Sequence, residues 1–90
     1  MTYLIYRSQP KSGQRPPARL SKNGKWLLFG PYGTPVWAVK EYFSKSAALK
    51  KAKKLKGVVI AIPDGYAPDA SGFVYDENDR RVPLESLVLT

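Results

Sequence analysis

The segment from residue 44 to residue 57, SKSAALKKAKKLKG, constrains the fold of this 90-residue chain more than any other part of it. At about 100° per residue, its apolar side chains gather on one side of a helix and its lysines cover the rest. The apolar side consists of Ala48, Ala52 and Leu55, with Leu49 at its edge. Because small alanines allow close packing, the segment predicts one basic helix lying across a sheet face.

The two ends of this helix carry their own signals. Ser44 is a suitable N-cap residue, since its hydroxyl can accept a hydrogen bond from a free first-turn amide. Phe43 before it is expected to pack on Ala48 as a hydrophobic staple. Gly57 is expected at the left-handed position just past the helix, where glycine has no steric cost.

Strands are predicted before the helix. Residues 3–6 (YLIY) combine aromatic and β-branched side chains, which favour a first strand. Residues 25–29 and 36–43 are apolar runs on either side of a loop with two glycines and two prolines, so they predict a hairpin. Within the second run, a period of two places Trp37 and Val39 on the face expected in the core.

The opposite face of this hairpin leaves two interpretations open. Trp26 and Tyr42 could lie on an open sheet face and stack on nucleic-acid bases. Alternatively, they form a second small core under the N-terminal loop, which is the interpretation we favour.

Residues 7–25 (RSQPKSGQRPPARLSKNGK) predict a long basic, Pro/Gly-rich loop that is exposed to solvent. Its three prolines block a helix, only Ala18 and Leu20 are apolar, and Asn23-Gly24 is a turn signal. A loop of this length in a small domain is uncommon and is often functional or disordered. A solvated linker and a functional loop are equal alternatives.

Further strands are predicted after the helix. Residues 58–62 (VVIAI) are almost continuously apolar, which predicts a strand inside the sheet. Residues 73–75 and 81–84 predict a second hairpin, with Pro83 placing its last strand at an edge. Residues 84–90 fit either a short helix or a final strand.

The fold class is therefore α+β. We expect a small antiparallel sheet of about five strands, in the order β-β-β-α-β-β, with the basic helix packed on one face. Residues 1–90 are expected to form a single domain, because a chain of this length is too short for two cores.

Charge is distributed unevenly along the chain. The net charge is +8, but residues 1–56 carry thirteen Lys or Arg and one acid, a net of +12, whereas residues 57–90 carry a net of −4. This asymmetry suggests either a polyanionic partner for the basic part or attraction between the two parts.

Several classes of chemistry are excluded by composition. The sequence has no cysteine and no histidine, which removes disulfides, thiolate catalysis and imidazole or thiolate metal sites. The acids are expected in solvated turns, and residues 76–79 (DEND) lack the spacing of a calcium loop. We therefore expect no enzyme activity, cofactor, metal or small-molecule substrate.

A cytoplasmic location is expected. Residues 1–5 are too short for the apolar region of a signal peptide, and the longest apolar run, residues 58–62, is too short to span a bilayer. No membrane partner is expected.

The basic side chains carry the functional hypothesis, a small accessory protein that binds nucleic acid through its phosphates. The residues expected to contact nucleic acid or an acidic partner are Lys50, Lys51, Lys53, Lys54, Lys56, Arg7, Lys11, Arg15, Arg19, Lys22 and Lys25. Candidates for base stacking are Trp26, Tyr32 and Tyr42. Six phosphate contacts would give log affinity a slope of about −5 against log salt on duplex DNA. Phosphate contacts do not read bases, so DNA and RNA are both open.

The alternative is a protein-binding inhibitor or adaptor that docks its basic surface on an acidic patch of a nucleic-acid-processing complex. The segment WAVKEYFSKSAALKKAKKLKGVVIAI has a strand–helix–strand layout that many small domains share. With so few secondary-structure elements, the short basic chain resembles small phage-encoded accessory proteins, including inhibitors of host defence complexes. Both hypotheses require the helix lysines to stay open to solvent instead of being covered by the acids of residues 57–90.

Overall fold

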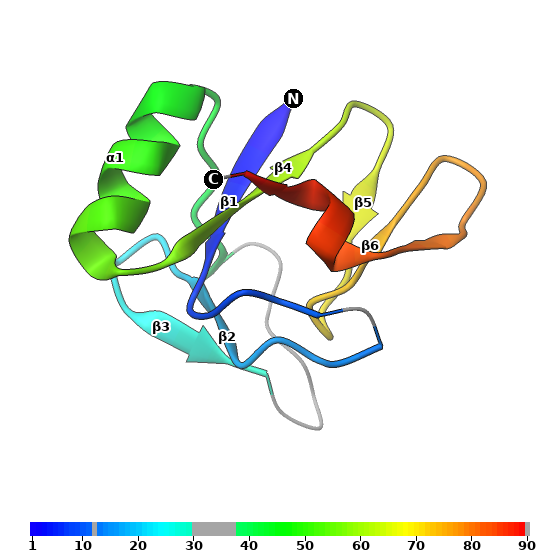
Figure 1. Cartoon of the computed structure of the whole chain (residues 1–90), viewed down its shortest axis with the longest axis horizontal. Helices are drawn as coiled ribbons and strands as arrows, with labels where there is room; N and C mark the ends of the chain where they lie inside the picture. Colours follow the sequence, from blue (N-terminus) through cyan, green and yellow to red (C-terminus); the bar gives the residue numbers. More distant parts are fainter. Residues whose placement is uncertain (12, 30–37, 90) are drawn as a thin grey trace.

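A computed structural model describes residues 1–11, 13–29 and 38–89 (Figure 1). The elements in chain order are β1 (Thr2–Tyr6), β2 (Ala18–Leu20), β3 (Trp26–Leu28), α1 (Lys45–Leu55), β4 (Val58–Ile62), β5 (Ala67–Pro68), β6 (Val74–Tyr75), β7 (Arg81–Val82), the 3-10 helix η2 (Leu84–Leu87) and β8 (Val88–Leu89). None of the helices among these residues is long and apolar enough to cross a membrane.

The main sheet confirms the expected α+β class. It has five antiparallel strands in the order β3-β2-β1-β4-β8, and a second sheet has the order β5-β6-β7. The longest pairing joins β1 to β4, from Thr2 opposite Ile62 to Tyr6 opposite Val58. As predicted, residues 58–62 form an interior strand, and they lie between β1 and β8.

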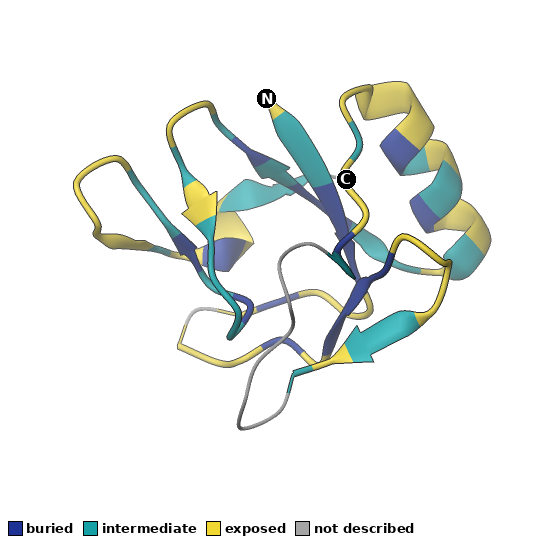
Figure 2. Cartoon of the chain, turned by 180° about the vertical axis from the view of Figure 1, so that it is seen from behind, coloured by how far each residue is buried: buried dark blue, intermediate teal, exposed yellow. Residues whose placement is uncertain are grey.

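Both faces of the main sheet are covered, because side chains alternate along its strands. On one face, Ile5 and Val59 pack against the helix through Ala48 and Ala52. On the other face, the core contains Leu4, Tyr6, Val39, Ile60, Ile62, Val74 and Leu84. Figure 2 shows the resulting pattern, with buried positions of α1 facing the sheet and exposed positions facing outward.

The helix begins as predicted but does not end as predicted. Ser44 is the N-cap, and its Oγ accepts from the Ala47 amide at 3.4 Å. The left-handed residue is Lys56, with φ 58°, whereas the Gly57 amide donates to the Ala52 carbonyl at 2.8 Å. The expected staple is wrong as well, since Phe43 is 77% exposed.

Glycine is required at position 57 because neighbouring atoms leave no room for a side chain, and not because the backbone there is left-handed. A Cβ at this position would lie 2.8 Å from Ile5 Cγ2 and 3.0 Å from the Tyr6 carbonyl oxygen. Contacts below 3.0 Å do not occur for real Cβ atoms, so the absence of a side chain lets the chain enter β4 directly beside β1.

The predicted hairpin between residues 25–29 and 36–43 is wrong for the part that the structure describes. β3 pairs with β2, and the turn between them contains Gly24 with φ 83°. Residues 38–43 instead make isolated bridges, Tyr42 with Tyr3 and Val39 with Ser21. The loop at 30–35 and the first two residues of the predicted return strand, including Trp37, lie outside the described residues.

The continuous loop predicted over residues 7–25 is also wrong, because β2 lies inside it. Ala18, Arg19 and Leu20 are all buried between β1 and β3. Two of the prolines that were expected in solvent, Pro10 and Pro16, are buried too. The exposed positions between β1 and β2 are residues 7–9, 11, 13–15 and 17.

The C-terminal predictions hold. β6 and β7 form the predicted hairpin, in which Asp76 Oδ1 accepts from the Asn78 and Arg80 amides at 2.9 Å each. β7 is an edge strand, as Pro83 indicated. Residues 84–89 contain both elements that the sequence left open, a 3-10 turn followed by a two-residue strand. The strand β5 was not predicted.

Candidate nucleic-acid interface

The helix lysines form one wall of the candidate site. Ala47, Lys50, Lys51 and Lys54 have the spacing of one helix face, beside the buried stripe of Ala48 and Ala52. Lys50 and Lys54 are exposed and Lys51 is half-buried. Like charges three and four residues apart repel one another by a few tenths of a kcal/mol each, so a negative ligand here would relieve a cost of the free protein.

The segment before the helix forms the other wall. Its backbone is fixed by the Lys40 amide, which donates to the Leu20 carbonyl at 2.9 Å, and by the Tyr42 amide, which donates to the Tyr3 carbonyl at 2.9 Å. Val39 is buried in the core on the far face of the sheet, so period two directs Lys40 and Tyr42 toward the α1 side. Tyr42 packs against the core beneath the helix.

Between these walls lies an open groove of about 450 Å³. We call it the lysine groove, and its lining residues are Lys40, Tyr42, Ala47, Lys50, Lys51 and Lys54. The Lys40 ammonium lies 5.4 Å from the centre of the Tyr42 ring. Among the described residues, the lining includes four lysines and no acid, so the groove concentrates positive charge around an aromatic ring.

The acids of the C-terminal part lie away from this groove. Figure 1 places α1 at one end of the long axis and the turn at residues 76–80 at the other. In the described part of the chain, the salt bridge is between the Met1 amine and Asp64 at 2.7 Å, and no helix lysine pairs with an acid. The Met1 amine donates to Asp64 and thereby lowers the pKa of that carboxyl. The helix lysines are therefore open to an external ligand.

Other predicted lysines lie outside the lysine groove. Lys53 borders a separate, smaller hollow of about 200 Å³ between α1, β4 and β8. Lys56 is exposed at the helix end, and Lys22 and Lys25 are exposed at the β2–β3 turn. That turn is near the groove wall, because the Lys22 amide donates to the Ala38 carbonyl at 2.9 Å.

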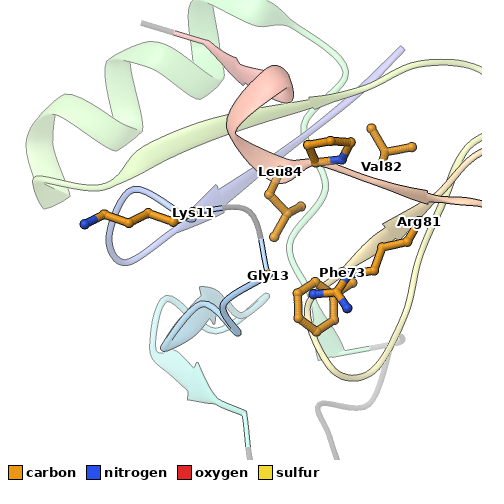
Figure 3. A pocket seen from close by; sticks show the side chains of 7 residues that line it. Lys11, Gly13, Phe73, Arg81, Val82 and Leu84 are labelled. Atoms are coloured by element: carbon orange, nitrogen blue, oxygen red, sulfur yellow. The ribbon is translucent and has the colours of Figure 1, made fainter.

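Among the described residues, no contact links the exposed basic side chains of the N-terminal loop to α1. These residues are Arg7, Lys11 and Arg15. Lys11 borders a hollow of about 280 Å³ that is lined mainly by apolar side chains of the β6–β7 hairpin and η2. Figure 3 shows its ammonium pointing away from Phe73 and Leu84, while Arg81 stacks on the Phe73 ring with its guanidinium carbon 3.5 Å from the ring centre.

Arg19 is a correction to the predicted binding set, since its side chain is only 1% exposed. The middle residue of β2 faces the core that contains Tyr6, and the loop at residues 69–72 covers it. Its Nη2 donates to the Asp69 carbonyl at 2.8 Å, and its guanidinium lies 4.9 Å from the Phe29 ring centre. A side chain held in this way is part of the fold and has no access to a ligand.

Tyr6 shares this buried environment. Its hydroxyl donates to the Gly72 carbonyl at 2.9 Å, which ties β1 to the loop before β6. Burial raises the pKa of Tyr6 from 10.0 to about 12, and the nearby positive charge of Arg19 offsets part of that rise. The phenol therefore stays neutral over the physiological range.

The three stacking candidates have different outcomes. Trp26 and Tyr42 are half-buried and pack against the core beneath α1, so the expected position of a second core under the N-terminal loop is wrong. Tyr42 also lines the lysine groove. Tyr32 lies outside the described residues.

Sequence reasoning missed one charged residue of this site, Lys40. The signal available for Lys40 was the period of two along residues 36–43, which puts it on the same face as Tyr42. Comparison with family models, curated proteins and solved structures found no match for this chain.

Proposed function

We propose that this protein binds nucleic acid through the lysine groove. The observation that carries the proposal is the convergence of four lysines from two separate elements on one groove that has no acid among its described lining residues. Nucleic-acid binding of this kind is driven by phosphate contacts and the release of counterions. The cytoplasmic location expected from the sequence belongs to the same proposal.

The experiment compares two charge-reversal variants that change the net charge by the same amount. Lys50→Glu with Lys54→Glu reverses two groove lysines, whereas Lys11→Glu with Arg15→Glu reverses two exposed charges of the N-terminal loop. Binding to labelled DNA and RNA is measured by fluorescence anisotropy at two salt concentrations. We expect the groove variant to lose about tenfold or more in affinity and the loop variant to lose much less.

An equal loss in both variants would mean that only total charge matters and that the groove is not the site. A wild-type protein that binds neither DNA nor RNA would overturn the proposal.

The acidic-protein alternative makes a different prediction in the same assay. A docking surface for carboxylates would bind a poly-glutamate peptide at least as tightly as a nucleic acid of equal charge. That result would replace nucleic acid by an acidic protein surface, whereas clearly tighter binding of nucleic acid supports the proposal.

A further inference from the structure

The outer edge of β7 presents the backbone groups of one residue. β7 pairs with β6 on one side, and no strand pairs with its other side in the described part of the chain. The Asp76 amide donates to the Arg80 carbonyl at 2.9 Å, so the backbone groups of residue 80 face β6. Because successive residues of an antiparallel strand point their amides and carbonyls to alternate sides, those of Arg81 point outward. An edge of this kind is a template for an added strand.

The side chain of Arg81 is oriented by an aromatic ring. Its guanidinium carbon lies 3.5 Å from the centre of the Phe73 ring, which fixes the plane of the guanidinium while the residue stays exposed (Figure 3). Among the described residues, no acid forms an ion pair with it. A flat guanidinium with a fixed orientation and permanent charge suits the two oxygens of a carboxylate.

The hollow of about 280 Å³ adjoins this edge. Its lining includes Phe73, Arg81, Val82 and Leu84, with Lys11 at its border and no acid among the described lining residues. Val82 pairs with Val74, which is buried in the core, so Val82 and Arg81 lie on opposite faces of β7. A hollow that touches both faces runs along the edge of the strand. Its volume is below the usual range of small-molecule pockets, about 300–1,000 Å³, so it suits a single side chain.

We propose that the edge of β7 and this hollow bind an extended peptide segment of a protein partner, in which an apolar residue precedes an acidic one. The acidic residue pairs with Arg81 in an antiparallel arrangement and exchanges two main-chain hydrogen bonds with it. Paired residues of neighbouring strands have their side chains on the same face, so its carboxylate reaches the guanidinium. The apolar residue before it lies opposite Val82 and points toward Leu84 in the hollow.

The backbone groups at this edge favour a peptide over a nucleic acid as the ligand, since a sugar-phosphate chain has no amide donor for the Arg81 carbonyl. The site is also separate from the lysine groove, because no residue lines both. The inference therefore goes beyond the proposed function and does not rest on it. A protein with both sites can hold a nucleic acid and a protein partner at the same time.

The experiment titrates a blocked peptide of sequence GSLESG into the isotope-labelled protein and follows the amide signals by NMR. The signals of residues 73 and 81–84 should shift. Arg81→Lys keeps the charge but loses the paired donors of the guanidinium, so it should weaken binding about tenfold, the effect of one charge-assisted hydrogen bond. Arg80→Lys is the matched control, since Arg80 is an exposed neighbour that lies outside the hollow, and it should bind the peptide as the wild type does.

Two N-methylated forms of the peptide test the strand pairing. Methylation of the glutamate amide removes the donor to the Arg81 carbonyl and should weaken binding tenfold or more. Methylation of the leucine amide should have little effect, because that amide points away from β7. Equal binding of the two methylated peptides would show that no strand is added.

Three other results would overturn the inference. One is a wild-type protein whose signals do not shift with the peptide at millimolar concentration. Another is an Arg81→Lys variant that binds as tightly as the wild type, since charge alone would then explain the contact. The third is loss of peptide binding in Lys50→Glu with Lys54→Glu, which would place the peptide in the lysine groove. Nucleic-acid binding by Arg81→Lys should equal that of the wild type, so this site and the proposed function can fail separately.

Discussion

At the scale of single residues, Tyr6 should make the free energy of unfolding depend on pH in the alkaline range. Its pKa is 10.0 when solvated and about 12 in the folded protein, where burial disfavours the phenolate. Because the folded pKa is the higher one, this group contributes stability that is complete below pH 10 and is lost as the pH rises toward 12. A shift of this size corresponds to about 3 kcal/mol.

Tyr6→Phe tests this link. The variant should be less stable than the wild type at pH 8 by about 1 kcal/mol, because the Gly72 carbonyl loses its hydrogen bond. Between pH 10 and pH 12, the wild type should lose about 2–3 kcal/mol of stability that the variant keeps, so the difference between the two proteins should shrink and then reverse in favour of Tyr6→Phe. Urea unfolding at a series of pH values measures both effects. Parallel pH curves would show that Tyr6 titrates normally in the folded protein.

Arg19 shows where single-residue reasoning from sequence fails. An arginine between Ala18 and Leu20 in a proline-rich, basic segment has every mark of a solvent-exposed charge. Its burial depends on β1, on Phe29 and on the loop at 69–72, all of which are brought together only by the tertiary structure. No local pattern in residues 7–25 contains that information.

At the scale of elements, substitutions at two neighbouring residues at the end of α1 should change the stability of the protein in opposite directions. Lys56 has φ 58°, a conformation that costs a side-chain-bearing residue roughly 1–2 kcal/mol, so Lys56→Gly should stabilise the protein by up to about 1 kcal/mol. Gly57→Ala should destabilise it by about 1–3 kcal/mol, because the new Cβ would press on Ile5 and on the Tyr6 carbonyl.

Chemical denaturation of the two variants and of Lys56→Ala, the control for the lost lysine, measures these effects. The helix end expected from the sequence, with Gly57 in the left-handed position, would make Lys56→Gly destabilising, since glycine is a poor helix residue. The sign of the Lys56→Gly effect therefore decides between the two descriptions.

The elements that the sequence predicted correctly are those defined by local patterns. α1 has a clear helical period and a capping serine, β4 is a continuous apolar run, and the β6–β7 hairpin surrounds a polar turn. β2 and β5 have only three and two residues, which is too short for a period to appear. The pairing of residues 38–42 with Ser21 and Tyr3 could not be predicted, since it depends on contacts far apart in sequence.

The candidate site likewise has one part that depends on a local sequence pattern and one part that depends on tertiary contacts. The lysine stripe of α1 was predictable because it is a property of one helix. The groove was not, because its second wall comes from Lys40 and Tyr42, which the tertiary structure places beside the helix.

At the scale of the whole molecule, the fold keeps the basic helix and the acidic turn far apart in space, whereas the sequence shows only that basic and acidic residues lie in different parts of the chain. The chain measures 33 × 26 × 23 Å, and Figure 1 shows α1 and the acidic turn at residues 76–80 at opposite ends of the long axis. Screening extends over about 8 Å at 0.15 M salt and about 30 Å at 0.01 M. The acidic turn should therefore influence binding at the lysine groove only at low salt.

Glu77→Gln with Asp79→Asn tests this separation. Both side chains are exposed, and asparagine tolerates the left-handed conformation of residue 79, φ 60°, so the turn should be retained. At 0.01 M salt, removing two distant negative charges should raise affinity for oligothymidylate about twofold, because long-range repulsion of the phosphates falls. At 0.15 M salt no change should be measurable, whereas Lys50→Glu with Lys54→Glu should weaken binding at both concentrations. A clear gain at 0.15 M would mean that the bound strand reaches the acidic turn, and the ligand would then have to extend along the whole molecule instead of lying in the groove alone.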